Sequence, residues 1–141
     1  MVKITMKPIT VQTVVNAPMD KVWEYWTSPE HITGWAFASD DWEALAVEND
    51  LRTGGKFKTR MQAKNGSSGF DFTGTYTDVI ENELIEYDMD DGRHVKVEFE
   101  ETPDGVKIIE AFDPEKENPE DVQRSGWQAI LDNFKKYVEK L

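Results

Sequence analysis

Hydrophobic and polar residues alternate along the middle of the chain, and this pattern predicts β-strands. Two examples are Lys-Phe-Lys-Thr-Arg-Met and Val-Lys-Val-Glu-Phe-Glu, which contain residue types that strands favour. An alternating strand has one dry face and one wet face. The expected strands cover residues 9–15, 41–49, 55–63, 70–80, 84–89, 94–101 and 106–112.

Four turn signals separate the central strands. They are Asn65-Gly66, a turn at Asn82, Asp91-Gly92 and Asp104-Gly105, and residues of these types favour tight hairpin connections. Because the connections are short, successive strands are expected to run antiparallel in a meander.

The C-terminal segment has a different periodicity and predicts one long helix over 119–141. Asn118 is expected to cap it, and Pro119 suits its first position. At 1.5 Å per residue the helix would be about 34 Å long, enough to cross a whole sheet. The residues that recur at helical spacing are Val122, Trp127, Ile130, Leu131, Phe134, Val138 and Leu141. Of these, Trp127, Ile130, Leu131 and Phe134 are expected to be buried.

The segment between the first two strands predicts two short helices. Ala17-Pro18 and Ser28-Pro29 are start signals, because proline at the first helical position costs no hydrogen bond. The second helix is expected to end near Gly34-Trp35. Three tryptophans within thirteen residues, at 23, 26 and 35, either fill the core or close the end of a hollow structure.

This order of elements predicts an α+β domain that spans residues 1–141. A strongly curved, seven-stranded antiparallel sheet would wrap around the long C-terminal helix, and the two short helices would close one end. A sheet that curves around a helix cannot touch it everywhere, so the gap is the expected place for an internal cavity.

Composition excludes several kinds of site. The chain has no cysteine, which excludes disulfides, thiolate metal sites and cysteine nucleophiles and fits a reducing compartment. Its two histidines, His31 and His94, are expected on different elements and cannot form a multi-histidine metal site. We therefore expect no metal and no cofactor. The N-terminus lacks the apolar core of a signal peptide, and no apolar stretch is long enough to span a membrane, so a cytoplasmic location is expected.

The formal net charge of −12 argues against nucleic acid and anionic lipid as partners, since both carry negative charge. A small neutral ligand or a basic protein surface remains compatible with it. The chain is expected to act as a monomer.

Several short motifs together resemble a known family. They are Val15-Asn-Ala-Pro18, Val22-Trp23, Trp26-Thr-Ser-Pro29-Glu30, Trp35, Gly54-Gly55-Lys56-Phe57, Phe72-Thr-Gly74-Thr-Tyr76, Asp91-Gly92-Arg93 and Gly126-Trp127. In this order, over about residues 8–141, they resemble the bacterial homologues of the activator of heat-shock-protein ATPase, within the START-like (SRPBCC) superfamily. The resemblance implies the helix-grip fold.

The resemblance also implies a range of functions. Relatives in the superfamily bind sterols, lipids, flavonoids or polyketides, and some cyclise or dehydrate polyketides. The eukaryotic activators carry an additional N-terminal domain that contributes to chaperone binding, whereas this sequence begins directly at the first strand. A chaperone partner is therefore the less favoured implication.

No residue pattern identifies a catalytic group. Gly66-Ser67-Ser68-Gly69 lacks the spacing of a nucleophile elbow. His31 is expected on the surface and His94 at the start of a strand. Glu110 and Asp71 lie within predicted strands, and either one would be a ligand anchor or a general base if it pointed into the cavity.

These features favour binding of a small hydrophobic or aromatic molecule, and they do not favour an enzyme. The alternatives are a polyketide cyclase or dehydratase, which needs an acid/base pair in the cavity, and a chaperone-interacting module, which needs no cavity. Rings, methionines and a few polar groups are the expected binding residues. They are Trp26, Trp35, Phe37, Trp42, Phe57, Met61, Phe72, Tyr76, Tyr87, Met89, His94, Phe99, Glu110, Trp127 and Leu131.

Overall fold

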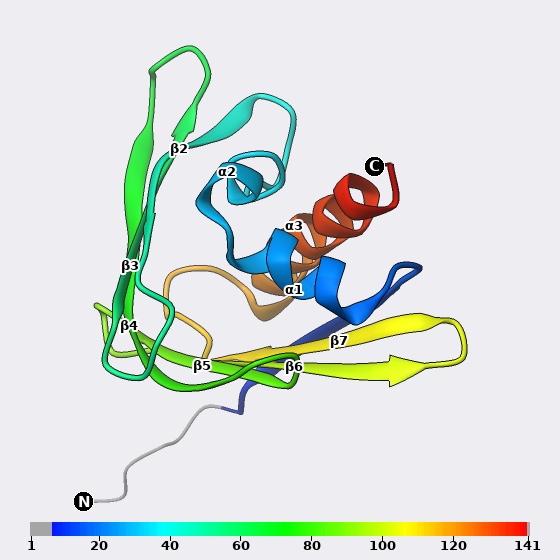
Figure 1. Cartoon of the computed structure of the whole chain (residues 1–141). Coiled ribbons are helices and arrows are strands. Elements are labelled where there is room, and N and C mark those ends of the chain that lie inside the picture. The colour runs from blue at the N-terminus through cyan, green and yellow to red at the C-terminus, as the bar shows by residue number, and fades with distance from the viewer. Residues whose placement is uncertain (1–6, 141) are drawn as a thin grey trace, which may run out of the picture.

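The computed structural model describes residues 7–140, so Leu141 of the predicted helix and residues 1–6 lie outside the described residues. Seven antiparallel strands form one sheet in the order β1-β7-β6-β5-β4-β3-β2 (Figure 1). The strands are β1 (Ile9–Val15), β2 (Trp42–Asn49), β3 (Lys56–Ala63), β4 (Gly69–Ile80), β5 (Leu84–Met89), β6 (His94–Thr102) and β7 (Gly105–Phe112). The helices are α1 (Met19–Thr27), α2 (Pro29–Ile32) and α3 (Glu120–Lys140).

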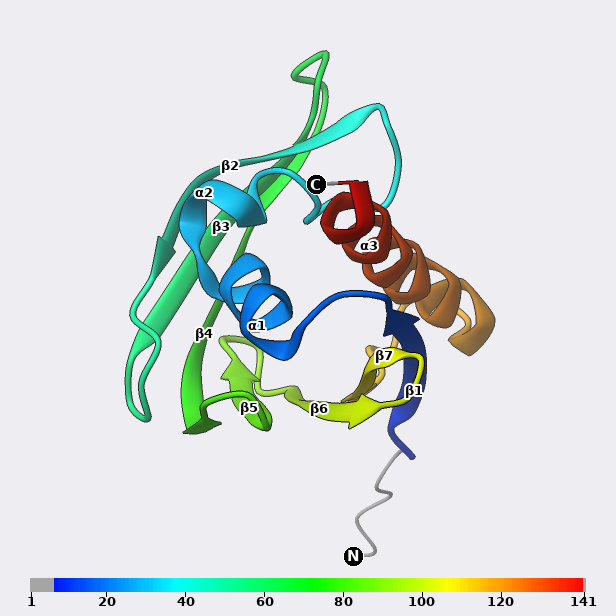
Figure 2. The same cartoon turned by 45° about the vertical axis from the view of Figure 1, so that its right-hand side comes forward.

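The sheet curls into a half-barrel, and α3 lies within its concave side (Figures 1 and 2). The two short helices, α1 and α2, connect β1 to β2 and cover the open side of the curve. The predicted α+β helix-grip architecture is therefore confirmed, with element bounds within one or two residues of the expected ones.

Tight turns connect the strands where the sequence predicted them. Asn82 adopts a φ of 66° and Gly92 a φ of 94°, a region that asparagine and glycine enter more easily than other residues. These turns let β4, β5 and β6 pair with their neighbours in sequence.

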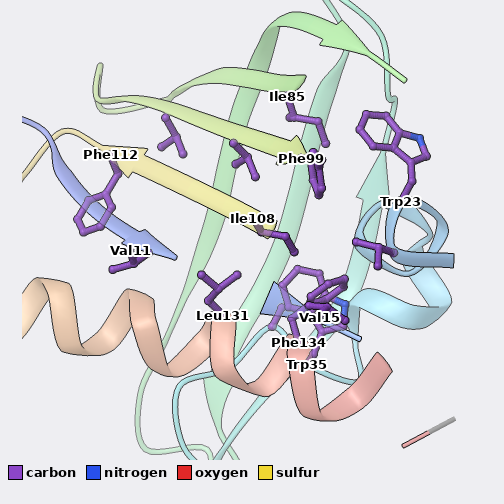
Figure 3. Close-up of a cluster of buried hydrophobic side chains, with 14 of the residues drawn as sticks. Val11, Val15, Trp23, Trp35, Ile85, Phe99, Ile108, Phe112, Leu131 and Phe134 are labelled. Atoms are coloured by element: carbon purple, nitrogen blue, oxygen red, sulfur yellow. The ribbon is translucent and has the colours of Figure 1, made fainter. Parts of the chain in front are cut away.

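The core lies between the concave face of the sheet and α3 (Figure 3). On β7 every second residue is buried, because alternate side chains of a strand point to the same face. On α3, Leu131 and Phe134 are fully buried as predicted, whereas Trp127 and Ile130 are only half-buried. The ring of Phe134 packs edge-on against Trp26 at 4.8 Å and Trp35 at 4.9 Å between centroids.

The start of α3 differs from the prediction. The side chain of Asn118 donates to Glu115 Oε1 at 2.8 Å instead of capping the helix. The buried Gln123 fixes the preceding loop, since its Nε2 donates to the Asn118 carbonyl at 2.8 Å and its Oε1 accepts from the Glu115 amide at 2.8 Å. A side chain from inside the helix thus holds the loop that precedes α3.

Candidate functional site

A pocket of about 270 Å³ lies between the concave face of the sheet, α3 and the α1–α2 segment. Strands β2 to β5 and β7 supply most of its wall, and α3 contributes Trp127 and Ile130. These two helix residues are half-buried because they face the pocket instead of the packed core.

Ten of the fifteen predicted binding residues lie on the wall of this pocket. They are Trp26, Trp35, Phe57, Met61, Phe72, Tyr76, Tyr87, Met89, Glu110 and Trp127. The structure brings together residues from α1, the loop after α2, four strands and α3, which are far apart in the sequence.

Two of the other five predicted residues are in the packed core. Phe99 faces inward, but its ring packs edge-on against Trp23 at 5.3 Å and Trp26 at 5.6 Å. Leu131 is fully buried on the neighbouring face of α3. Both side chains support the pocket from behind and do not line it.

The remaining three lie at the edge or outside. Trp42 contacts Phe70 with 6.1 Å between ring centroids, near the end of the β3–β4 hairpin. Phe37 is in the loop after α2, where its carbonyl accepts from Asn133 Nδ2 at 2.5 Å. His94 forms an ion-pair arrangement with Asp88 and Glu86, with its Nδ1 2.6 Å from Asp88 Oδ1 and its Nε2 3.0 Å from Glu86 Oε1.

Ten wall residues were missed by the sequence analysis. They are Ile32, Ala36, Val47, Glu48, Asn49, Thr59, Phe70, Ile85, Arg93 and Ile130. Alternation gave a signal for some: Thr59 lies between Phe57 and Met61 on one face of β3, and Phe70 lies two residues before Phe72 on β4.

The wall residues of β2 had no such signal. The register between β2 and β3 shifts between Leu45 and Glu48, and Ala46 has a φ of 49°. This bulge reorients the second half of β2 and brings Val47 and Asn49 to the pocket. A position with positive φ that is occupied by alanine cannot be recognised from residue type.

Aromatic rings form most of the apolar wall. Phe57 contacts Tyr87 and Tyr76, with centroids 4.9 and 5.3 Å apart. Across the pocket, Trp127 stacks on Phe112 at 4.0 Å with an interplanar angle of 9°. Edge and face packing of this kind fixes ring positions and leaves flat surfaces toward the pocket.

One polar group on the wall is already satisfied by the protein. The Tyr76 hydroxyl donates to Asn49 Oδ1 at 2.5 Å, and Asn49 Nδ2 donates to the Thr27 carbonyl at 2.7 Å. This chain of bonds links β4 through β2 to the end of α1. Burial raises the pKa of Tyr76, so its hydroxyl stays protonated.

Glu110 on β7 is a second polar residue on the wall, and its carboxyl oxygens are accessible from the pocket. Its side chain is 7% exposed and lines the pocket, and it forms no hydrogen bond or ion pair with any of residues 7–140. Burial raises the pKa of Glu110 to about 8.

Tyr87 and Arg93 are two further polar residues on the pocket wall. Burial raises the pKa of Tyr87, and the nearby Glu110 raises it further while Arg93 opposes this. Tyr87 is 8% exposed, and its hydroxyl has no hydrogen-bond partner within the described part of the chain. Arg93 is held by Asp91, with 2.9 Å between Nε and Oδ2.

The other residues singled out by the sequence lie away from the pocket. Asp71 forms surface ion pairs with Lys58 at 3.8 Å and Arg60 at 3.5 Å. His31 was expected on the surface but is half-buried, stacked on Tyr25 at 3.9 Å and hydrogen-bonded through Nδ1 to the Tyr137 hydroxyl at 2.8 Å. It therefore ties α2 to α3.

Two further features concern metals and membranes. Among residues 7–140 no group of three or more histidine, cysteine or acidic side chains is arranged to hold a metal ion. None of the helices in the same range is both long and apolar enough to cross a membrane.

Comparisons with known proteins give a consistent result. The model of the family described as "Activator of Hsp90 ATPase homolog 1-like protein" matches residues 16–139. The AHSA1-like protein from Aeromonas hydrophila is 43% identical with a TM-score of 0.89, over 94% of this chain and 92% of that one. The protein Chr148 from Cytophaga hutchinsonii is 51% identical with a TM-score of 0.82, over the same shares of the two chains.

A more distant structure supports the fold alone. Protein CV1439 from Chromobacterium violaceum is 21% identical with a TM-score of 0.85, over 95% of this chain and 99% of that one. A comparison with curated proteins gave no match.

Proposed function

The chain belongs to the family of proteins similar to the activator of Hsp90 ATPase homolog 1, and we propose that it binds a small hydrophobic or aromatic molecule in the pocket between its sheet and α3. The observation that supports this most is the pocket itself, which is about 270 Å³ in volume and lined by aromatic rings. A pocket of this kind offers apolar area for affinity and a few fixed polar groups for selectivity.

The expected affinity comes mainly from the apolar surface that the ligand removes from water, at roughly 25 cal/mol per Å² before the costs of association. The rings of Phe57, Phe72 and Trp127 suit a flat ligand, because aromatic faces stack. Met61 and Met89 give the wall some freedom to adapt.

The experiment that tests the proposal is a screen of planar polyphenols and polyketide-like compounds by tryptophan fluorescence and NMR. Bound compounds are expected to quench fluorescence, since Trp26, Trp35 and Trp127 line the pocket. They are also expected to raise the melting temperature, with about 2.7 kcal/mol of stabilisation at a ligand concentration 100 times the dissociation constant.

Two matched variants test whether the ligand binds in the pocket. Ile130→Trp adds bulk at the pocket wall and is expected to weaken binding, whereas Ile80→Trp makes the same change at an exposed position and is expected to leave it unchanged. Phe72→Ala provides a second pocket variant. Binding that Ile130→Trp and Phe72→Ala leave intact would contradict the proposed site.

A second candidate function is an enzyme of the cyclase or dehydratase class, and Glu110 favours it. A buried carboxyl with a pKa raised to about 8 is suited to proton transfer near neutral pH. Turnover of a bound compound that Glu110→Gln abolishes without loss of binding would establish this candidate over the simple binder.

A third candidate follows from the family description, which refers to activation of the Hsp90 ATPase. An interaction module of that kind would use the acidic outer surface and needs no pocket. If no compound in the screen shifts the resonances of the pocket residues, this candidate replaces the binder.

A further inference from the structure

Three buried polar residues on the pocket wall, Glu110, Tyr87 and Thr59, form no side-chain hydrogen bond with any of residues 7–140, and Glu110 and Tyr87 are the two of them that titrate. Among residues 7–140 every fully buried side-chain nitrogen or oxygen has a hydrogen-bond partner, so the unpaired oxygens of these residues are accessible from the pocket. Glu110 and Tyr87 line the same pocket, on strands that flank β6 from either side. Their position indicates that a ligand or solvent in the pocket supplies the missing partner.

We infer that Glu110 and Tyr87 together receive the carbonyl oxygen of a flat, uncharged aromatic ligand, each donating one hydrogen bond to it. This inference rests on the proposed function, since it names the chemistry of the ligand for the same pocket.

The strand register places the two groups on one face of the sheet. Glu110 pairs with Val97 and Phe112 with Val95, while Tyr87 pairs with Val95 from the other side. Val95, Val97 and Phe112 are fully buried, so the groups are separated by an apolar floor. A ligand atom above that floor lies between these two groups, whereas the other polar wall residues of the sheet are on β2, β3 and β4.

The neighbours of Glu110 on β1, β6 and α3 are uncharged, so they do not stabilise an ionised carboxylate. Its strand neighbours are Val11 on β1 and Val97 on β6, which carry no charge, and α3 presents Trp127 and Ile130 to the pocket.

The titratable and charged side chains elsewhere on the wall are Tyr76, Tyr87, Glu48 and Arg93. Asp91 holds the guanidinium of Arg93, and burial is the cause of the raised pKa of Glu110, about 8. An unpaired charge at such a site is costly, so the neutral acid is the stable form near pH 7.

A neutral carboxyl and a phenol each offer one O–H donor, and a carbonyl oxygen has two lone pairs to accept them. A carboxylic acid kept neutral by an apolar site and paired with a tyrosine is a known way to bind such an oxygen. An amine would need the ionised carboxylate and would bring a second positive charge to a pocket whose wall already holds Arg93. The apolar walls favour the neutral ligand for the same reason that they favour the neutral acid.

Three compounds with one ring skeleton test the inference: 9-fluorenone carries the carbonyl, fluorene carries a methylene group in its place, and 9-aminofluorene carries an amine. The quantity measured is the ratio of the dissociation constants of fluorene and fluorenone, by tryptophan quenching and NMR at pH 6. Tyr87→Phe and Glu110→Leu are each expected to lower this ratio about tenfold, and a change in apolar binding that affects both compounds equally cancels in the ratio. The infrared carbonyl stretch of bound fluorenone is expected at lower frequency in the wild type than in either variant.

The pH dependence gives an independent readout. Fluorenone binding to the wild type is expected to weaken as pH rises through about 8, because the ionised carboxylate repels the carbonyl oxygen, whereas fluorene binding stays constant. Glu110→Gln keeps a neutral donor at all pH values and is expected to remove this dependence.

The outcomes separate the inference from the proposed function. Equal binding of fluorene and fluorenone, with no effect of either variant on the ratio, overturns the carbonyl assignment and leaves the hydrophobic binder standing. Preferred binding of 9-aminofluorene that strengthens as Glu110 ionises overturns it in favour of an amine ligand. If none of the three compounds shifts the resonances of pocket residues, the inference fails, and the proposed function fails with it only if no compound of the wider screen shifts them either.

Discussion

Glu110 makes the stability of this protein depend on pH. Burial raises its pKa from 4.5 to about 8 in the folded chain. Between these values the folded state keeps a proton that the unfolded state releases, so the free energy of unfolding falls as pH rises. The slope from one such group reaches about 1.4 kcal/mol per pH unit.

We therefore expect Glu110→Gln to remove this fall, so that wild type and variant diverge from pH 5 to pH 8 and run parallel above it. Urea unfolding over pH 5 to 9 measures the difference. Asp71→Asn, which changes an exposed carboxylate, serves as the control and should not reproduce it. Parallel curves over the whole range would show that Glu110 is charged in the folded protein.

His94 makes the free energy of unfolding depend on pH in the same direction as Glu110. Burial lowers the pKa of His94, but its hydrogen bonds with Asp88 and Glu86 outweigh this and raise it overall. The folded state therefore holds a proton more tightly than the unfolded state. The resulting stabilisation is fully present below the unfolded pKa of about 6.5 and is lost as pH rises through the folded pKa.

NMR titration of the His94 ring is expected to give a pKa above that of a histidine in a short peptide. Asp88→Asn is expected to lower it, because the variant removes the closer of the two carboxylates, 2.6 Å from Nδ1. A His94 pKa that does not move in Asp88→Asn would mean that the pair does not exist in solution.

At the scale of elements, the two faces of α3 have different roles: one packs in the core and the other lines the pocket. Two variants distinguish these roles. Phe134 is fully buried between Trp26 and Trp35, and truncation of such a ring typically costs about 3–5 kcal/mol. Trp127 is half-buried and lines the pocket. Phe134→Ala is therefore expected to destabilise the protein more than Trp127→Ala, although tryptophan is the larger residue.

Urea unfolding gives the two stabilities, and the ligand screen gives the two affinities. Trp127→Ala is expected to lose more affinity than its smaller loss of stability suggests. The reverse ranking in both measurements would place the packed core at Trp127 and remove the pocket from this face of α3.

The periodicities of the strands and of α3 were sufficient to predict the architecture. Alternation along β3 put Phe57 and Met61 on one face, and both reach the pocket. The same rule also marks an error in the prediction, because residues 94 and 99 of one strand point to opposite faces. His94 and Phe99 could not both line the pocket, and the structure has neither of them there.

Other parts of the site depend on tertiary packing, which the sequence pattern does not encode. Whether an inward side chain on β6 meets a helix or an empty space depends on where α1 lies, and Trp23 covers Phe99. The bulge near Ala46 shifts the register of β2 without glycine or proline. The direction of Glu110 was left open by its sequence context, and the pairing of β7 with β1 and β6 decides it.

At the scale of the whole molecule, the net charge of −12 has consequences for partners. A negatively charged surface repels phosphate backbones, whereas nucleic-acid binding depends on cationic protein groups that release counterions. We expect no detectable binding to single-stranded or duplex DNA or RNA at physiological salt in a fluorescence polarisation titration. Micromolar binding would mean that a local basic site outweighs the net charge.

The same net charge is expected to weaken the folded state through repulsion between acidic groups. Raising NaCl from 10 to 150 mM shortens the screening length from about 30 to about 8 Å, which reduces this repulsion more than it weakens the short surface ion pairs. The melting temperature is therefore expected to rise over this range, as measured by circular dichroism. A variant in which exposed Glu81, Glu101 and Glu117 are changed to lysine carries half the net charge and should show a smaller rise. If salt lowers the melting temperature of the wild type, attractive pairs such as Lys135–Glu139, at 2.7 Å, contribute more to stability than the net repulsion removes.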